Sequence, residues 1–285
     1  MNNIFNIKRF GFVLRKDMME NMKRYTSLFL AMIGIMSIIS IWFTWDYCKS
    51  YGSSDRYDYL SHNLDLLIIL SNCFLAGGLM FASTFMVPMN SKLKRLSFLS
   101  NPTSNFEKFL SRWLIVTIGY IIAFFVAMWI ADALRVAVVS AKFPDLEISF
   151  LDLTKLYYPT DNYSSMYYMV PKFVFTLFVC MYFLFQSFFL LGATFFEKSS
   201  FVKTFVALLV ILCAYVALCS GAINLFYEEG FYGFTRVMDS FLGEKNDKKE
   251  QLVIAWAHLL PAIVVFANWL LAFFRFRESE ITKRL

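Results

Sequence analysis

The chain has 285 residues, of which 59% are hydrophobic, 19% aromatic and 17% charged, and its formal net charge is +6. Soluble domains are about 45–50% apolar and about 25% charged, so this composition argues against a soluble domain and favours helices that face lipid. The five cysteines form no Cys-x-x-Cys pair, and the two histidines are far apart in sequence. These patterns argue against a disulfide framework, a structural zinc site or a local metal motif.

The N-terminal segment 7–25 alternates apolar and basic residues at helical spacing. One face carries Ile7, Phe10, Leu14, Met18 and Met22, and another carries Lys8, Arg15, Lys16 and Lys23. This pattern predicts a helix that lies in the membrane interface and is attracted to anionic headgroups. The alternative is an ordinary flanking helix whose charges only set the topology.

Six long apolar runs follow, and each is long enough to cross a hydrocarbon core of about 30 Å at about 1.5 Å per residue. The runs cover residues 27–45, 64–89, 113–131, 170–195, 201–226 and 252–274. Pro171 suits the first turn of the fourth helix, where its missing N–H costs little. The sequence therefore predicts an all-α integral membrane protein, with an interfacial helix at 1–26, a six-helix bundle at 27–274 and a basic tail at 275–285.

The distribution of charge predicts the orientation of the bundle. With the N-terminus inside, 17 of the 27 Lys and Arg residues fall on the cytoplasmic side, and most acidic residues fall outside. Positive loops face the cytoplasm, so both termini are expected there.

Small and polar residues inside the runs predict how the helices pack. The third run carries a stripe of small residues at a spacing of four, formed by Gly119, Ala123, Ala127 and Ala131. Such a stripe lets helices approach closely, either within one chain or at a homodimer seam. The amides Asn72, Gln186, Asn224 and Asn268 lie within runs and are expected to tie helices together.

Two motifs resemble catalytic or nucleotide-binding patterns without matching them. The segment 192–199 resembles a phosphate-binding loop, but Glu197 replaces its second glycine and would repel phosphates, so we interpret it as the end of the fourth helix. The pair Glu228–Glu229 is too far from Arg236 to match a paired-glutamate intramembrane protease. The chain is therefore predicted to carry no ATP site of its own.

The basic segment 90–113 between the second and third runs has the strongest local signals. Ser91 suits the cap of a short helix, and Asn101–Pro102 ends that helix because proline disfavours helical geometry in the residue before it. Ser104 and Glu107 then form a predicted capping box for a new helix that continues into the third run. The segment is predicted to be a stiff protrusion at the cytoplasmic surface.

At this segment the chain resembles the permease subunits of ABC-2-type transporters. The resemblance rests on the basic helix before the first span, the six-span topology and the segments Arg95–Leu99, Pro102–Ser104 and Phe106–Leu110, with a similar basic tail from Phe274. It implies that the loop contacts a separate ATPase subunit as a coupling helix. By this resemblance, the residues expected to contact the ATPase subunit are Leu93, Arg95, Leu96, Leu99, Pro102, Ser104, Phe106, Glu107 and Phe109.

The resemblance implies a permease of an ATP-driven exporter in the bacterial cytoplasmic (inner) membrane, without catalytic, cofactor-binding or metal-binding residues of its own. ATP is expected on the partner subunit. The expected partners are the ATPase, a second permease chain in a homodimer or heterodimer, and the lipid bilayer, with no nucleic acid. A non-transporting scaffold or assembly factor, and an intramembrane enzyme, are the alternatives.

Overall fold

The computed structural model describes residues 5–50, 56–87, 103–144, 146, 148–153, 171–196, 198–226, 232 and 247–282. The regular structure of these residues is helical, without any strand. The helices are α1 (Ile7–Glu20), α2 (Met22–Ser50), α3 (Arg56–Ala82), α5 (Asn105–Leu114), the π-helical segment η2 (Ile115–Gly119), α6 (Tyr120–Lys142), α7 (Pro171–Phe195), α8 (Ser200–Phe226) and α10 (Asp247–Thr282).

Six of the described helical stretches are long and apolar enough to cross a membrane, which confirms the predicted number of apolar spans. Pro171 opens α7, as its position in the sequence predicted, and α7 ends at Phe195, so the segment resembling a phosphate-binding loop is a helix end. α10 continues through most of the predicted basic tail at 275–285 and ends at Thr282. Its buried Phe276, only 1% exposed, packs within the chain and supports that continuation.

The third span is much longer than its apolar run. α5, η2 and α6 form one uninterrupted stretch of 38 residues from Asn105 to Lys142. At about 1.5 Å per residue this stretch is roughly 57 Å long, more than the ~40–45 Å of a whole bilayer. It therefore connects the segment that precedes the span with the opposite end of the bundle.

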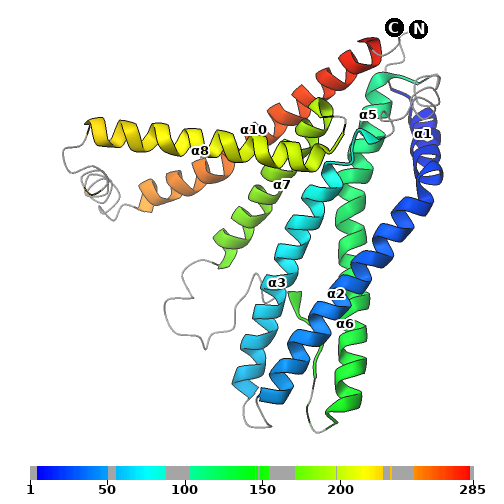
Figure 1. The fold of residues 1–285 in the computed structure, drawn as a ribbon, viewed down its shortest axis with the longest axis vertical. Helices are drawn as coiled ribbons and strands as arrows, with labels where there is room; N and C mark the ends of the chain where they lie inside the picture. Colours follow the sequence, from blue (N-terminus) through cyan, green and yellow to red (C-terminus); the bar gives the residue numbers. More distant parts are fainter. Residues whose placement is uncertain are drawn as a thin grey trace.

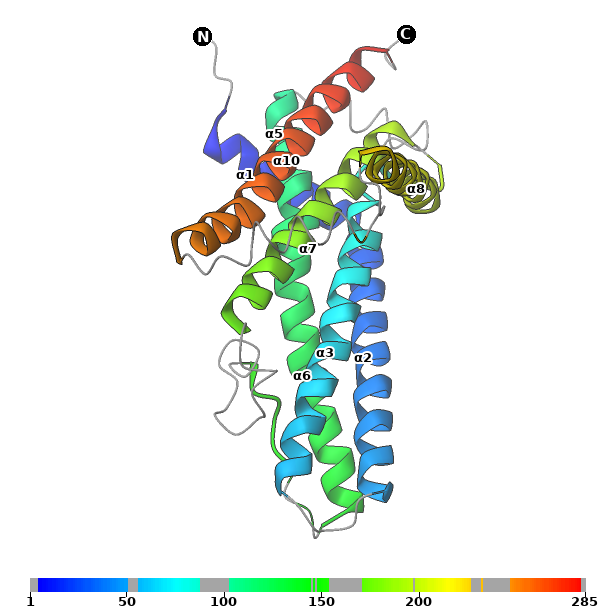
Figure 2. The ribbon, with the colours of Figure 1, turned by 90° about the vertical axis from the view of Figure 1, so that its left-hand side faces the viewer.

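The helices form an elongated bundle with one crowded end. α2, α3 and α6 run side by side along the long axis, and α7 and α10 cross obliquely and pack on each other (Figure 1). α8 leaves the bundle sideways, and Figure 2 shows it almost end-on. α1, α5, the end of α10 and the connection between α7 and α8 all lie at the same end (Figures 1 and 2).

Two buried apolar clusters hold the bundle together. The cluster near the crowded end joins α3, α5, α7 and α10 and includes Phe85, Phe109 and Phe276. The other joins α2, α3, α6 and α7 and includes Met36 and Tyr182. The C-terminal half of the small-residue stripe belongs to this second cluster, in which Ala127 and Ala131 are 0% and 2% exposed.

Two of the four predicted amide ties are present. The Gln186 side chain donates to Thr117 Oγ1 at 2.9 Å and joins α7 to η2. Asn268 donates to Ser187 Oγ at 3.0 Å and joins α10 to α7. Asn72 and Asn224 are exposed, so the prediction that they are buried is wrong for this chain on its own.

A buried ion pair lies just past residue 131, where the third apolar run was predicted to end. Arg135 Nε donates to Asp132 Oδ1 at 2.7 Å within α6. The same two side chains hold the returning segment 148–153, because Arg135 donates to the Ser149 carbonyl and the Leu151 N–H donates to Asp132, both at 2.8 Å. Mutual neutralisation at this helical spacing explains why α6 continues past Ala131.

Candidate functional site

The candidate site is the junction between α1 and the start of α5, at the crowded end of the bundle. Its centre is the predicted capping box, which the structure confirms. The Ser104 hydroxyl accepts from the Glu107 N–H at 3.2 Å, and the Glu107 carboxylate accepts from the Ser104 N–H at 3.1 Å. The box satisfies two N–H groups at the helix start, and its carboxylate interacts favourably with the positive end of the helix dipole.

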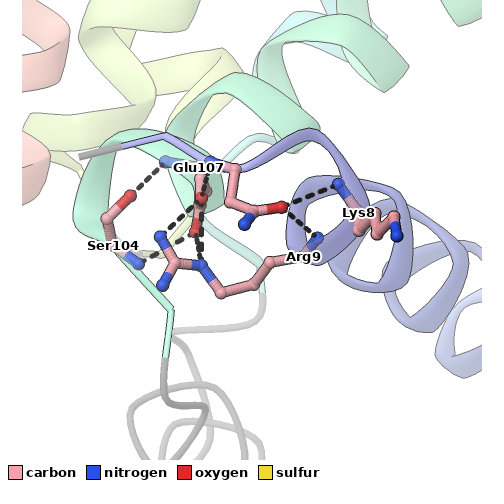
Figure 3. A network of polar contacts seen from close by, with 5 residues as sticks. Lys8, Arg9, Ser104 and Glu107 are labelled. Atoms are coloured by element: carbon pink, nitrogen blue, oxygen red, sulfur yellow. Dashed lines mark hydrogen bonds and ion pairs between the residues drawn. The ribbon is translucent and has the colours of Figure 1, made fainter. Parts of the chain in front are cut away.

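The Glu107 carboxylate also receives the N-terminal helix. It accepts from Arg9 Nε and Arg9 Nη2, each at 2.8 Å, and from the Asn6 N–H at 2.8 Å (Figure 3). Asn6 in turn caps α1, because its side chain accepts from the Lys8 N–H at 3.0 Å. One buried carboxylate therefore organises the first turns of two helices that are about a hundred residues apart in sequence.

The electrostatics of this contact are asymmetric. The Glu107 side chain is fully buried, whereas that of Arg9 is 36% exposed. Hydrogen bonding to Glu107 raises the pKa of the Arg9 guanidinium above its ordinary value, so Arg9 is always a cation here. A buried carboxylate needs such a partner, since burying an unpaired charge is costly.

A second ion pair fastens the other end of α1. Arg112 Nη2 donates to Asp17 Oδ1 at 3.1 Å, and the side chains are each 7% exposed. Ser111 Oγ donates to the second carboxylate oxygen at 3.3 Å, while Arg112 Nη1 donates to the Phe85 carbonyl at 3.1 Å. This contact ties α1, α5 and the turn after α3 into one unit. We call the two ion pairs, Arg9–Glu107 and Asp17–Arg112, the clasp.

Aromatic side chains fill the space behind the clasp. Phe109 is 7% exposed and lies 5.2 Å from Phe85 and 5.4 Å from Phe273 between ring centroids. Phe106 is 40% exposed and touches Phe5 and Phe273 only at the ring edges. Among the four described members of the predicted ATPase contact, Phe106 is therefore the side chain with the most surface left for a partner.

The remaining predicted contact residues, Leu93, Arg95, Leu96, Leu99 and Pro102, lie outside the described residues, as does the short helix predicted around them. Sequence reasoning missed Arg9, Asp17 and Arg112. The available signal was weak: Glu107 is the one carboxylate in the basic segment 90–113, and Asp17 is one of two in the basic segment 7–25. Nothing in the sequence joins them to cations about 95 residues away.

The described part of the chain contains no group of three or more His, Cys, Asp or Glu residues that could hold a metal ion. The junction is thus a set of ion pairs and aromatic contacts, suited to holding helices in register. Comparison with protein-family models, curated proteins and solved structures finds no match.

Proposed function

We propose that the chain is the permease subunit of an ABC-2-type, ATP-driven exporter in a bacterial cytoplasmic membrane. A separate ATPase subunit binds the segment 90–112, and a second permease chain, identical or related, completes the transporter. Both termini and the clasp face the cytoplasm. ATP binds and is hydrolysed on the partner, so the chain itself performs no chemistry.

The observation that carries this proposal is mechanical continuity. The predicted ATPase-facing segment leads directly into α5, which continues as one helical stretch of 38 residues to the other end of the bundle. The clasp joins that helix to α1 through the Arg9–Glu107 and Asp17–Arg112 pairs. A force on residues 103–112 therefore reaches α6 through the uninterrupted helix and α1 through the clasp, because α1 cannot separate from α5 without breaking these ion pairs.

The exposed surface of α1 supports its placement at the membrane interface. The clasp occupies the face that carries Arg9, Val13 and Asp17, while Ile7 and Phe12 are 75% and 71% exposed. An apolar surface of this kind is favourable at the boundary between headgroups and acyl chains, and the neighbouring basic residues are attracted to anionic lipid.

Co-purification from the native membrane tests the proposal. We expect the tagged full chain to retain an ATPase with a phosphate-binding loop in near-stoichiometric amount. The Phe106→Asp variant should lose it, because a carboxylate is placed on the exposed aromatic surface beside the clasp. Phe150→Asp is the matched control, since Phe150 is also exposed, at 58%, but lies on the segment that follows α6. Stoichiometric recovery of a different protein with no ATPase would favour the scaffold alternative and contradict the exporter.

A further inference from the structure

A pocket of about 590 Å³ lies between α3, α6 and α7, within the membrane-spanning stretches. This volume falls in the range of about 300–1,000 Å³ that is typical of small-molecule sites. Its walls come from residues 67–74, 121–128 and 175–183, with Leu153 closing one side. None of the residues that line the pocket belongs to the clasp, and the exporter proposal assigns the pocket no role.

The lining is suited to hydrocarbon and unsuited to polar groups. Among the residues whose side chains the structure describes, no charged one lines it, and the aromatic rings of Phe74, Phe124 and Phe178 are among its walls. The polar exceptions apart from the Tyr182 ring are Ser71 and Asn72. Each of these donates to a backbone carbonyl of its own helix, at 2.7 and 2.9 Å. A charged or strongly polar ligand would lose its hydration here without compensation.

The wall that carries Leu153 is built into the fold. The Asp132–Arg135 pair binds the segment 148–153 through the Leu151 N–H and the Ser149 carbonyl. Leu151 then packs against the buried cluster around Met36 and Tyr182, which places Leu153 at the pocket. A buried ion pair in a membrane span is costly unless its groups are satisfied. In this chain the Asp132–Arg135 pair holds the segment 148–153 in place, and that segment forms one wall of the pocket.

We propose that this pocket binds one acyl chain of a membrane phospholipid. The occupant follows from three features on these helices: an uncharged lining, partial enclosure, and a position in the span where lipid chains are the surrounding solvent. The headgroup stays outside, because no described side chain of the lining carries a positive charge to pair with a phosphate. This inference requires a membrane-spanning chain but no ATPase, so it stands or fails separately from the proposed exporter function.

Photo-crosslinking tests it. The full chain is reconstituted in vesicles of phosphatidylethanolamine and phosphatidylglycerol that contain a trace of phosphatidylcholine with a diazirine near the end of one acyl chain. After irradiation, adducts are mapped by mass spectrometry. We expect them to concentrate on residues 67–74, 121–128 and 175–183.

Two variants that fill the pocket sharpen the test. Met128→Trp introduces bulk from α6, and Leu153→Trp introduces it from a side chain that is 41% exposed and therefore tolerant of substitution. Each should lower pocket adducts by about tenfold, which corresponds to roughly 1.4 kcal/mol of lost affinity. Ile122→Trp is the control, since Ile122 is on α6, 60% exposed and not part of the pocket.

The two results are distinguishable. A selective loss of pocket adducts in Leu153→Trp, with the control unchanged, supports the site. Adducts spread evenly over the exposed faces of α2 and α8, or an equal yield in Leu153→Trp and Ile122→Trp, would overturn it. Thermal unfolding of each variant identifies any that is misfolded, and Leu153→Trp then decides the result.

Discussion

Replacing Asp17 by Asn should release α1 from α5. The substitution keeps the shape of the side chain but removes its charge, which leaves Arg112 buried without its ionic partner. Breaking a buried ion pair from one side typically costs about 3–5 kcal/mol. We take about 3 kcal/mol, because Arg112 retains its hydrogen bond to the Phe85 carbonyl. At about 1.4 kcal/mol per factor of ten, the opening of α1 should become roughly 100-fold more frequent.

Hydrogen exchange of the reconstituted chain measures this opening directly. Amides of α1 should exchange about 100-fold faster in the variant, while those of α6 keep their rates. Glu20→Gln is the matched control on the same helix. It breaks the ion pair between Lys16 Nζ and Glu20 Oε1, which are 3.6 Å apart. The two side chains are 40% and 50% exposed. Exposed pairs contribute about 0.3–0.5 kcal/mol, so its effect should be about twofold.

The double variant Asp17→Leu with Arg112→Met removes both charges. Replacing a buried pair by apolar side chains is often close to neutral, so slow exchange of α1 should largely return. Equal exchange in Asp17→Asn and Glu20→Gln would refute the claim that this pair fastens α1.

Two further predictions concern the packing of the other helices. Gly192→Ala places a Cβ on the side chain of Thr204 and should lower the free energy of unfolding by about 1–3 kcal/mol, seen as a lower melting temperature. Gly221→Ala is its control, because a Cβ there meets nothing within 4 Å and the melting temperature should stay the same or rise. Asp132→Asn should free the segment 148–153 and speed its hydrogen exchange by roughly 100-fold, since the cost of an unpaired buried Arg is about 3 kcal/mol. Unchanged exchange in that segment would show that the ion pair does not hold it.

The features that the sequence predicted correctly are those encoded by local patterns. Runs of apolar residues are long enough to identify helices of spanning length by themselves. The Ser104–Glu107 spacing encodes the capping box, and Pro171 marks a helix start through its fixed backbone geometry. Each signal depends only on residues within one or two turns, so no tertiary knowledge was needed.

The features that were missed depend on contacts between distant segments. Glu107 meets Arg9 across 98 positions, and the intervening chain, which includes α2 and α3, carries no pattern that specifies the pairing. Asp132 and Arg135 appeared to end an apolar run, because a charge alone argues against a span. Their pairing at a spacing of three residues neutralises both charges and lets α6 continue. The apolar pattern of the sequence does not encode this pairing.

The proposed exporter requires an ATPase subunit to contact the segment 90–112, where Phe106 lies beside the clasp. A photoreactive amino acid placed at Phe106, with the same probe at Phe150 as control, tests that contact in native membranes without relying on the stability of a complex. We expect a crosslinked product with a nucleotide-binding ATPase from position 106 and none from position 150. Absence of that product at position 106, or equal yields at both positions, would rule out an ATPase contact at this surface.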